Sequence, residues 1–222
     1  MSNARPYHSP LREQQAAATR DRVLRSAGEL FGDRGYAGTT LPAIADRADV
    51  SVETVKAMGP KWSLMHAAYE VAFRGQEGDH PVEDDLDART AEGPVGAEDL
   101  LAGVLDFVID GNQRSSRLWV AFQAAAAADE ALQSALNEVI RRRDESLVFT
   151  VGAFAQRGWE PTHDRTATAL SLGYLVAPES HIHFVLRGGW SVEQYRAWLD
   201  SAVRSLFDLT RSSTAGARGP RP

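Results

Sequence analysis

The chain has 222 residues, of which 43% are hydrophobic, and its formal net charge is −6 at pH 7. It contains no Cys, which excludes disulfides, thiolate catalysis and Cys-based zinc sites. No apolar run approaches the roughly 20 residues that span a bilayer, and the N-terminus lacks the apolar core of a signal peptide, so a cytoplasmic location is expected.

The charge is unevenly distributed along the chain. Residues 1–75 carry ten Lys and Arg against eight Asp and Glu, whereas residues 76–210 carry 11 against 22. Affinity for DNA depends on local basic groups that neutralise phosphates. The acidic total therefore does not exclude a nucleic-acid partner for the N-terminal part.

The chain is expected to begin with a disordered arm over residues 1–16, whose Arg5 and Arg12 either reach a minor groove or stay in solvent. A first helix is predicted over Thr19–Arg34, because apolar residues recur there on one face. Gly35 is a plausible C-cap of that helix. The apolar face is formed by Val23, Leu24, Ala27, Leu30 and Phe31.

Two short helices joined by a tight turn follow, within TTLPAIADRADVSVETVKAMGPK. Thr40 is an N-cap residue type, and the face of the first helix consists of Leu41, Ile44, Ala45 and Ala48. Asp49 makes the turn, since Asp tolerates a left-handed backbone. Ser51 caps a second helix over Val52–Met58, which Gly59-Pro60 ends.

A helix pair of this spacing can place its second helix in the major groove while the first crosses the backbone. Val55 and Met58 would face the core, which leaves Val52, Glu53, Thr54 and Lys56 outside. A further helix is predicted over Lys61–Arg74, with a compact head of about 60 residues as the result.

Residues 76–96 form an acidic, Gly- and Pro-rich segment. Its EDDLD cluster is interpreted as a solvated loop rather than a divalent metal site. The rest of the chain reads as helical, without strand-like alternation. Helices are predicted over 97–113, 116–128, 130–157, 162–175, 178–187 and 191–209, followed by a disordered tail over 211–222.

Residues 17–65 resemble the DNA-binding head of the TetR family of transcriptional regulators. The resemblance is carried by Arg20, Ala27, Leu30-Phe31 and Gly35-Tyr36, and then by Thr39-Thr40, Ile44-Ala45, Ala48, Val50-Ser51, Thr54 and Lys61. Three features depart from the family pattern Thr-x-Tyr-x-x-Phe-x-x-Lys. The interval from Thr54 to Lys61 is one residue shorter and lacks the Tyr, and Met58 stands in place of Phe.

The resemblance implies an all-α fold with a helix-turn-helix domain over 17–75 (the motif at about 40–59) and a ligand-binding and dimerisation domain over 97–210. It implies a cavity for a small-molecule inducer, and a homodimer in which helices near 162–175 and 191–209 form a four-helix bundle. Such a dimer would bind an inverted-repeat operator on double-stranded DNA. No cofactor is expected.

Eight residues are candidates for DNA contact. Lys56 is suited to guanine or phosphate, and Glu53 either accepts from a cytosine amine or only stabilises the helix dipole. Ser51 is expected to cap and to contact a phosphate. The remaining candidates would anchor the backbone or face the groove: Arg20, Thr40, Val52, Thr54 and Lys61.

Seven residues are candidates for lining the ligand cavity, although residues of these types are more often ordinary core. They are Phe107, Trp119, Phe122, Phe154, Tyr174, His181 and Phe184. His181 and His183 would lie about 200° apart on a helix, so a shared metal is not expected. The consecutive Arg141–Arg143 are predicted to form surface ion pairs rather than an anion site.

No G-x-S-x-G, P-loop, G-x-G-x-x-G or H-E-x-x-H motif occurs, so catalysis is not expected. The sequence predicts a dimeric, ligand-responsive repressor. The alternative is an all-helical ligand-binding or dimerisation protein whose helix-turn-helix no longer reads DNA.

Overall fold

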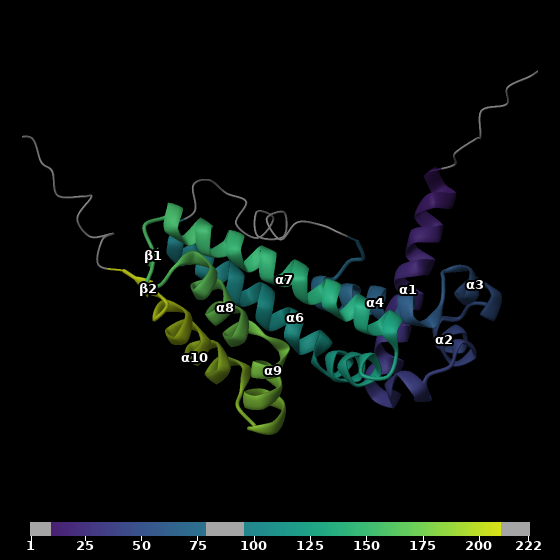
Figure 1. Ribbon diagram of the computed structural model, residues 1–222. Coiled ribbons are helices and arrows are strands. Elements are labelled where there is room, and N and C mark those ends of the chain that lie inside the picture. The colour runs from purple at the N-terminus through teal and green to yellow at the C-terminus, as the bar shows by residue number, and fades with distance from the viewer. Residues whose placement is uncertain (1–9, 79–95, 210–222) are drawn as a thin grey trace, which may run out of the picture. The chain divides into compact units, whose positions relative to one another are not determined.

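The computed structural model describes residues 10–78 and 96–209, which are helical apart from one pair of two-residue strands (Figure 1). They form two compact units. The head unit comprises the described residues up to 78 together with 117–135, and the body unit comprises 96–116 and 136–209. The predicted all-α class is confirmed.

Four helices build the first part of the head unit: α1 (Pro10–Gly38), α2 (Leu41–Ala48), α3 (Val52–Ala57) and α4 (Lys61–Arg74). Helix α1 packs against α2 and α4, and α2 packs against α3. Within α1 the chain leaves helical geometry at Gly35, whose φ of 71° suits a residue without a Cβ. This is the position at which the sequence predicted the helix to end.

Helix α1 begins at Pro10, well before the predicted start at Thr19. The prediction of a disordered arm is therefore wrong for residues 10–16. Residues 11–18 are all exposed, so this part of the helix has no buried apolar face and no apolar periodicity in its sequence. Its sequence, REQQAAA, consists of residues with high helix propensity. The rest of the arm (1–9), most of the acidic loop (79–95) and the tail (211–222) lie outside the described residues.

The core of the head unit includes residues far apart in sequence. The ring of Tyr69 on α4 lies 5.1 Å from that of Trp119 and 6.0 Å from that of Phe122. Gly28 on α1 permits close approach to this segment, since a Cβ there would lie 3.4 Å from Leu118. Residues 117–135 therefore pack with the head, although the sequence placed them in the ligand domain.

The body unit draws on α6 (Ala97–Ala126) and α7 (Glu130–Gln156), and on the later elements α8 (Arg165–Val176), α9 (Pro178–His181), η1 (Ile182–Arg187) and α10 (Val192–Arg204). Helix α8 packs against α9 and α10 (Figure 1). The predicted interruption between residues 113 and 116 is wrong, because α6 is continuous there.

Two short strands, β1 (Glu160–Pro161) and β2 (Phe207–Asp208), pair antiparallel. The sequence predicted helix up to residue 209, but α10 ends at Arg204. The strand pair places Phe207 beside Phe154, with ring centroids 5.0 Å apart. It thereby closes one end of the body core.

The corner between α8 and α9 follows from Pro178. Proline disfavours the helical region for the residue before it, and Ala177 is extended, with φ −61° and ψ 151°. Pro178 then starts α9, where its missing N–H is not needed. Helix α10 begins with a capping box between Ser191 and Gln194.

Within residues 10–78 and 96–209, no helix combines the length and the apolar character that crossing a bilayer requires.

Candidate nucleic-acid interface

Helices α2 and α3 are each delimited by local hydrogen bonds. The Thr40 hydroxyl oxygen accepts from the Ala43 N–H at 3.3 Å, and the Ser51 hydroxyl oxygen accepts from the Thr54 N–H at 3.1 Å. Between the two helices, Asp49 adopts the left-handed conformation (φ 52°, ψ 54°) that the sequence predicted for the turn. Gly59, with φ 125°, follows the end of α3.

Helix α3 has one buried face and one exposed face. Val55 is fully buried, whereas Glu53 and Lys56 are exposed and Val52 and Thr54 are half-exposed. Ser51 precedes the helix and is exposed. The five candidate groove residues of this segment therefore all reach the surface.

The hydroxyl groups of Ser51 and Thr54 also bond to each other, at 2.9 Å. Ser51 thus caps α3 as predicted. Because one of the two hydroxyl protons is used in this bond, the pair offers one hydroxyl proton to an outside acceptor such as a phosphate.

Lys61 is the first residue of α4, where Pro60 provides no side-chain cap. Its ammonium group lies 4.2 Å from the centroid of the Tyr36 ring, which in turn stacks on Phe31 at 5.7 Å. Partial burial lowers the pKa of Lys61. A cation at a helix N-terminus is unfavourable for the helix dipole, whereas an anion there is favourable. Lys61 and the first amides of α4 together suit a phosphate.

Arg20, a predicted phosphate anchor, is occupied within the chain. Its guanidinium donates through two nitrogens to the Glu77 carboxylate, each at 2.5 Å. This hydrogen bonding raises the pKa of Arg20. The structure therefore places Arg20 in an ion pair that joins α1 to the residues just after α4, and not in an unpaired position.

Sequence reasoning missed the contacts that hold the helix pair on α1. Arg22 donates to the carbonyl oxygen of Ala48 at 2.8 Å, and Arg47 bonds to Glu29 at 2.7 Å. The buried Thr39 hydroxyl lies 3.0 Å from the Leu30 carbonyl oxygen and 2.9 Å from that of Gly35. Partners 18 and 26 residues apart leave no local pattern in the sequence.

The seven candidate pocket residues do not form one group. Trp119 and Phe122 belong to the head core described above, and Phe107 and Phe154 are buried in the body unit. Phe184 packs on Trp198, with ring centroids 4.3 Å apart. Tyr174 is 81% exposed, so its prediction as a lining residue is wrong for the chain as described.

His181 is the polar member of that set. It is 2% exposed, and its Nδ1 lies 3.0 Å from the Ser116 hydroxyl oxygen. Burial lowers the pKa of His181, which favours the neutral ring at pH 7.

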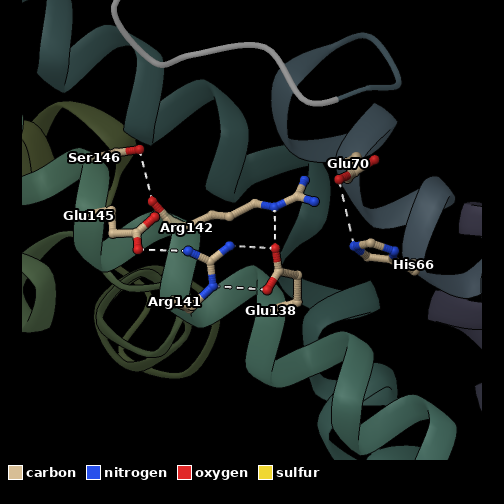
Figure 2. A network of polar contacts seen from close by, with 7 residues as sticks. All are labelled: His66, Glu70, Glu138, Arg141, Arg142, Glu145 and Ser146. Carbon is tan, nitrogen blue, oxygen red and sulfur yellow. Dashed lines mark hydrogen bonds and ion pairs between the residues drawn. The ribbon is translucent and has the colours of Figure 1, made fainter.

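Arg141 and Arg142 lie in surface ion pairs of α7 (Figure 2). Arg141 bonds to Glu138 and Glu145, both at 2.6 Å, and Arg142 bonds to Glu138 at 2.7 Å. The two guanidinium groups lower the pKa of Glu138 to about 2. Arg143 lies 3.4 Å from Asp144. These contacts confirm the predicted ion pairs.

Comparison with known proteins identifies the head. Residues 23–55 match the sequence profile of the family described as bacterial regulatory proteins, tetR family. This part of the head unit is therefore similar to the helix-turn-helix domain of that family. The matched residues run from α1 to α3, and so include the helix pair and its turn. A search of curated proteins found no significant match.

Solved structures share the fold along most of the chain. A TetR-family transcriptional regulator from Rhodococcus sp. is 22% identical with a TM-score of 0.67, over 86% of this chain and 98% of that one. A transcriptional regulator from Saccharomonospora viridis in complex with choline is 17% identical with a TM-score of 0.66, over 86% and 97%. FadR from Bacillus subtilis in complex with stearoyl-CoA is 15% identical with a TM-score of 0.64, over 85% and 97%. Most of the chain therefore has a fold that is known from solved structures.

Proposed function

We propose that the protein is a cytoplasmic, homodimeric transcriptional repressor that binds an inverted-repeat operator and is released from it by a small molecule. The observation that carries the proposal is the exposed face of α3. A six-residue helix capped by Ser51 buries Val55 and presents Glu53 and Lys56 to the outside within a tetR-type domain. No catalytic role is proposed.

The proposed DNA contacts divide into two kinds. Lys56 and Glu53 would face base edges in the major groove, and Ser51 or Thr54 would use the free hydroxyl proton on a phosphate. Lys61 with the α4 amides, and the exposed Thr40, would hold phosphates on the flanks. Val52 would contact apolar base edges.

The proposed dimer uses α8. Leu170 is 63% exposed and Tyr174 is 81% exposed, and these residues are one helical turn apart on the same face. Exposed apolar neighbours of this kind are typical of interaction surfaces. A second copy of α8 and α10 would cover them in a four-helix bundle, as the family resemblance implies.

Ligand control is proposed for the body unit, since two solved proteins of the same fold hold choline and stearoyl-CoA. A ligand shifts the dimer between DNA-binding and released arrangements only by its differential affinity for them.

The test is a gel shift on DNA flanking the protein's own gene. Lys56→Ala should reduce operator affinity by about 1–3 kcal/mol and relax base preference at one position. Lys61→Ala should instead lower the slope of log affinity against log salt by about 1. Arg187→Ala, which removes one exposed positive charge of the body unit, is the matched control.

Unchanged affinity in the Lys56 variant would remove its assignment. Absence of binding at low salt would favour the alternative, in which the helix-turn-helix no longer reads DNA. The Tyr that is missing between Thr54 and Lys61 is the feature that favours that alternative.

A further inference from the structure

Three side-chain polar atoms of the described residues are fully buried without a hydrogen-bond partner: His66 Nε2, Asn112 Oδ1 and His181 Nε2. The first lies 3.6 Å from a carboxylate oxygen of Glu70, one turn along α4 (Figure 2). The other two atoms, Asn112 Oδ1 and His181 Nε2, belong to the body unit. Buried polar atoms are nearly always bonded, so each of these two atoms requires a physical explanation.

Asn112 and Ser116 occupy successive turns of α6, so their side chains are neighbours on one face of that helix. The Asn112 amide nitrogen donates to the carbonyl oxygen of Val176 at 3.0 Å, and Ser116 bonds to His181 Nδ1 at 3.0 Å. Val176 and His181 flank the Pro178 corner between α8 and α9. Both unpartnered atoms therefore belong to the contact between α6 and this corner.

These contacts fix the chemistry of the two free atoms. Because the Asn112 nitrogen faces a carbonyl oxygen, the free amide atom is the oxygen, which can only accept. The free nitrogen of the neutral His181 ring donates when the Ser116 hydroxyl donates to Nδ1, and accepts in the other tautomer. A hydroxyl group, which both donates and accepts, can satisfy either atom.

The contacts described for Asn112 and His181 are with uncharged groups, some of them aromatic. Tyr195 is fully buried and lies edge-on to His181, with ring centroids 5.7 Å apart. The ring centroid of Phe184 lies 6.1 Å from that of Tyr195 and 4.7 Å from that of Trp190. Asn112 and Ser116 are themselves buried, at 0% and 1% exposure. An ionised group bound here without a charged partner would pay a large desolvation penalty.

We propose that Asn112 Oδ1 and His181 Nε2 form the polar end of a ligand site in the body unit that takes a small, uncharged, hydroxyl-bearing molecule with an apolar remainder. The site rests on the ligand-responsive function proposed above and gives that function a chemical class of ligand. Asn112 accepts the hydroxyl proton, His181 bonds to the hydroxyl oxygen, and the aromatic side chains contact the apolar part.

The test uses the full chain without DNA and four probes that differ in one group. Benzyl alcohol carries the hydroxyl, benzyl methyl ether lacks the donor, benzoate is an anion and benzylammonium is a cation. Calorimetry and thermal shift should show binding of benzyl alcohol and a raised Tm, with weaker effects of the other three.

Asn112→Leu and, as a second variant, His181→Leu should each weaken benzyl alcohol binding by about three- to tenfold, the loss of one neutral hydrogen bond. Gln113→Leu, which replaces an exposed amide one residue away, should leave binding unchanged. Each Leu variant removes an unpartnered buried atom but also one buried hydrogen bond, to Val176 or to Ser116. Probe affinities are therefore compared at a temperature at which the wild type and both variants are folded.

Two results would overturn the site. One is that benzyl alcohol does not bind, or binds equally to the wild type and Asn112→Leu. The other is that His181→Leu binds benzyl alcohol as tightly as the wild type does. If benzyl alcohol binds through Asn112 and operator affinity does not change, the site stands and the regulatory function fails. If the protein binds its operator but not benzyl alcohol, the ligand site fails and the DNA-binding function stands.

Discussion

Asp49 provides a direct test of how the turn between α2 and α3 is stabilised. It is the only residue other than Gly with positive φ in the described ranges, at φ 52°. A left-handed backbone costs an L-residue roughly 1–2 kcal/mol, which replacement by Gly would relieve. The same replacement lowers the stability of the folded state by about 0.5–1 kcal/mol, because Gly gives the unfolded chain more conformational freedom. Asp49 also puts a negative charge at the C-terminal end of α2, where the helix dipole disfavours it.

These terms together predict that Asp49→Gly raises the free energy of unfolding by about 0.5–1 kcal/mol. For a chain of this size the corresponding rise in Tm is about 2–4 °C per kcal/mol. Asp49→Ala is the matched control, because it removes the same charge and keeps the side-chain clash. The Gly variant should exceed the Ala variant by about 1 kcal/mol.

The assay is urea unfolding of the full chain, monitored by circular dichroism. If the dependence of the unfolding free energy on urea concentration is the same for all variants, a change in the midpoint reports a change in stability. Equal stability of the Gly and Ala variants would show that charge, not backbone strain, governs this position. A destabilised Gly variant would refute the reasoning altogether.

Three further predictions concern other parts of the chain. Glu77→Gln should free Arg20 to contact a phosphate, and should thereby steepen the slope of log DNA affinity against log salt concentration by about 1. DNA titrations at several salt concentrations measure this slope, and the effect should vanish when Arg20→Ala is also present. Gly59→Ala should destabilise the chain by more than about 1 kcal/mol in urea unfolding, since its φ is 125° and a Cβ would lie 2.7 Å from Ser63 Oγ; a neutral result would contradict the turn geometry. Leu170→Asp should shift the protein from dimer to monomer in analytical ultracentrifugation, whereas Leu186→Asp, at a residue that is also exposed, should not; a dimer that survives Leu170→Asp would exclude the α8 interface.

The helix pair was predictable because its limits are set locally. Thr40 and Ser51 each accept a hydrogen bond from an amide three residues ahead, and Gly59-Pro60 ends α3 through its own backbone. The left-handed turn at Asp49 depends on a single residue. Signals of this kind are contained within a few residues and can be read without any knowledge of the tertiary structure.

The errors arise where distant partners decide the outcome. The sequence predicted separate helices over 97–113 and 116–128, yet Asn112 and Ser116 lie on one continuous helix, and their buried side chains bond to residues 64 and 65 positions away. Arg20 looked available for DNA, but its partner Glu77 is 57 residues away. The sequence placed Trp119 in the ligand domain, but it packs on Tyr69 of the head unit. An apolar residue pattern shows that a side chain is buried and does not show against which element.

DNase footprinting tests most directly the central claim that α3 reads an operator. The DNA is that flanking the protein's own gene, and the wild type, Lys56→Ala and Arg187→Ala are compared at low salt. The account predicts protection of two half-sites whose centres lie about 34–36 Å apart. Lys56→Ala should need several-fold more protein for the same protection, and Arg187→Ala should need no more than the wild type. Absence of any protected sequence, or protection that Lys56→Ala leaves intact, would contradict it.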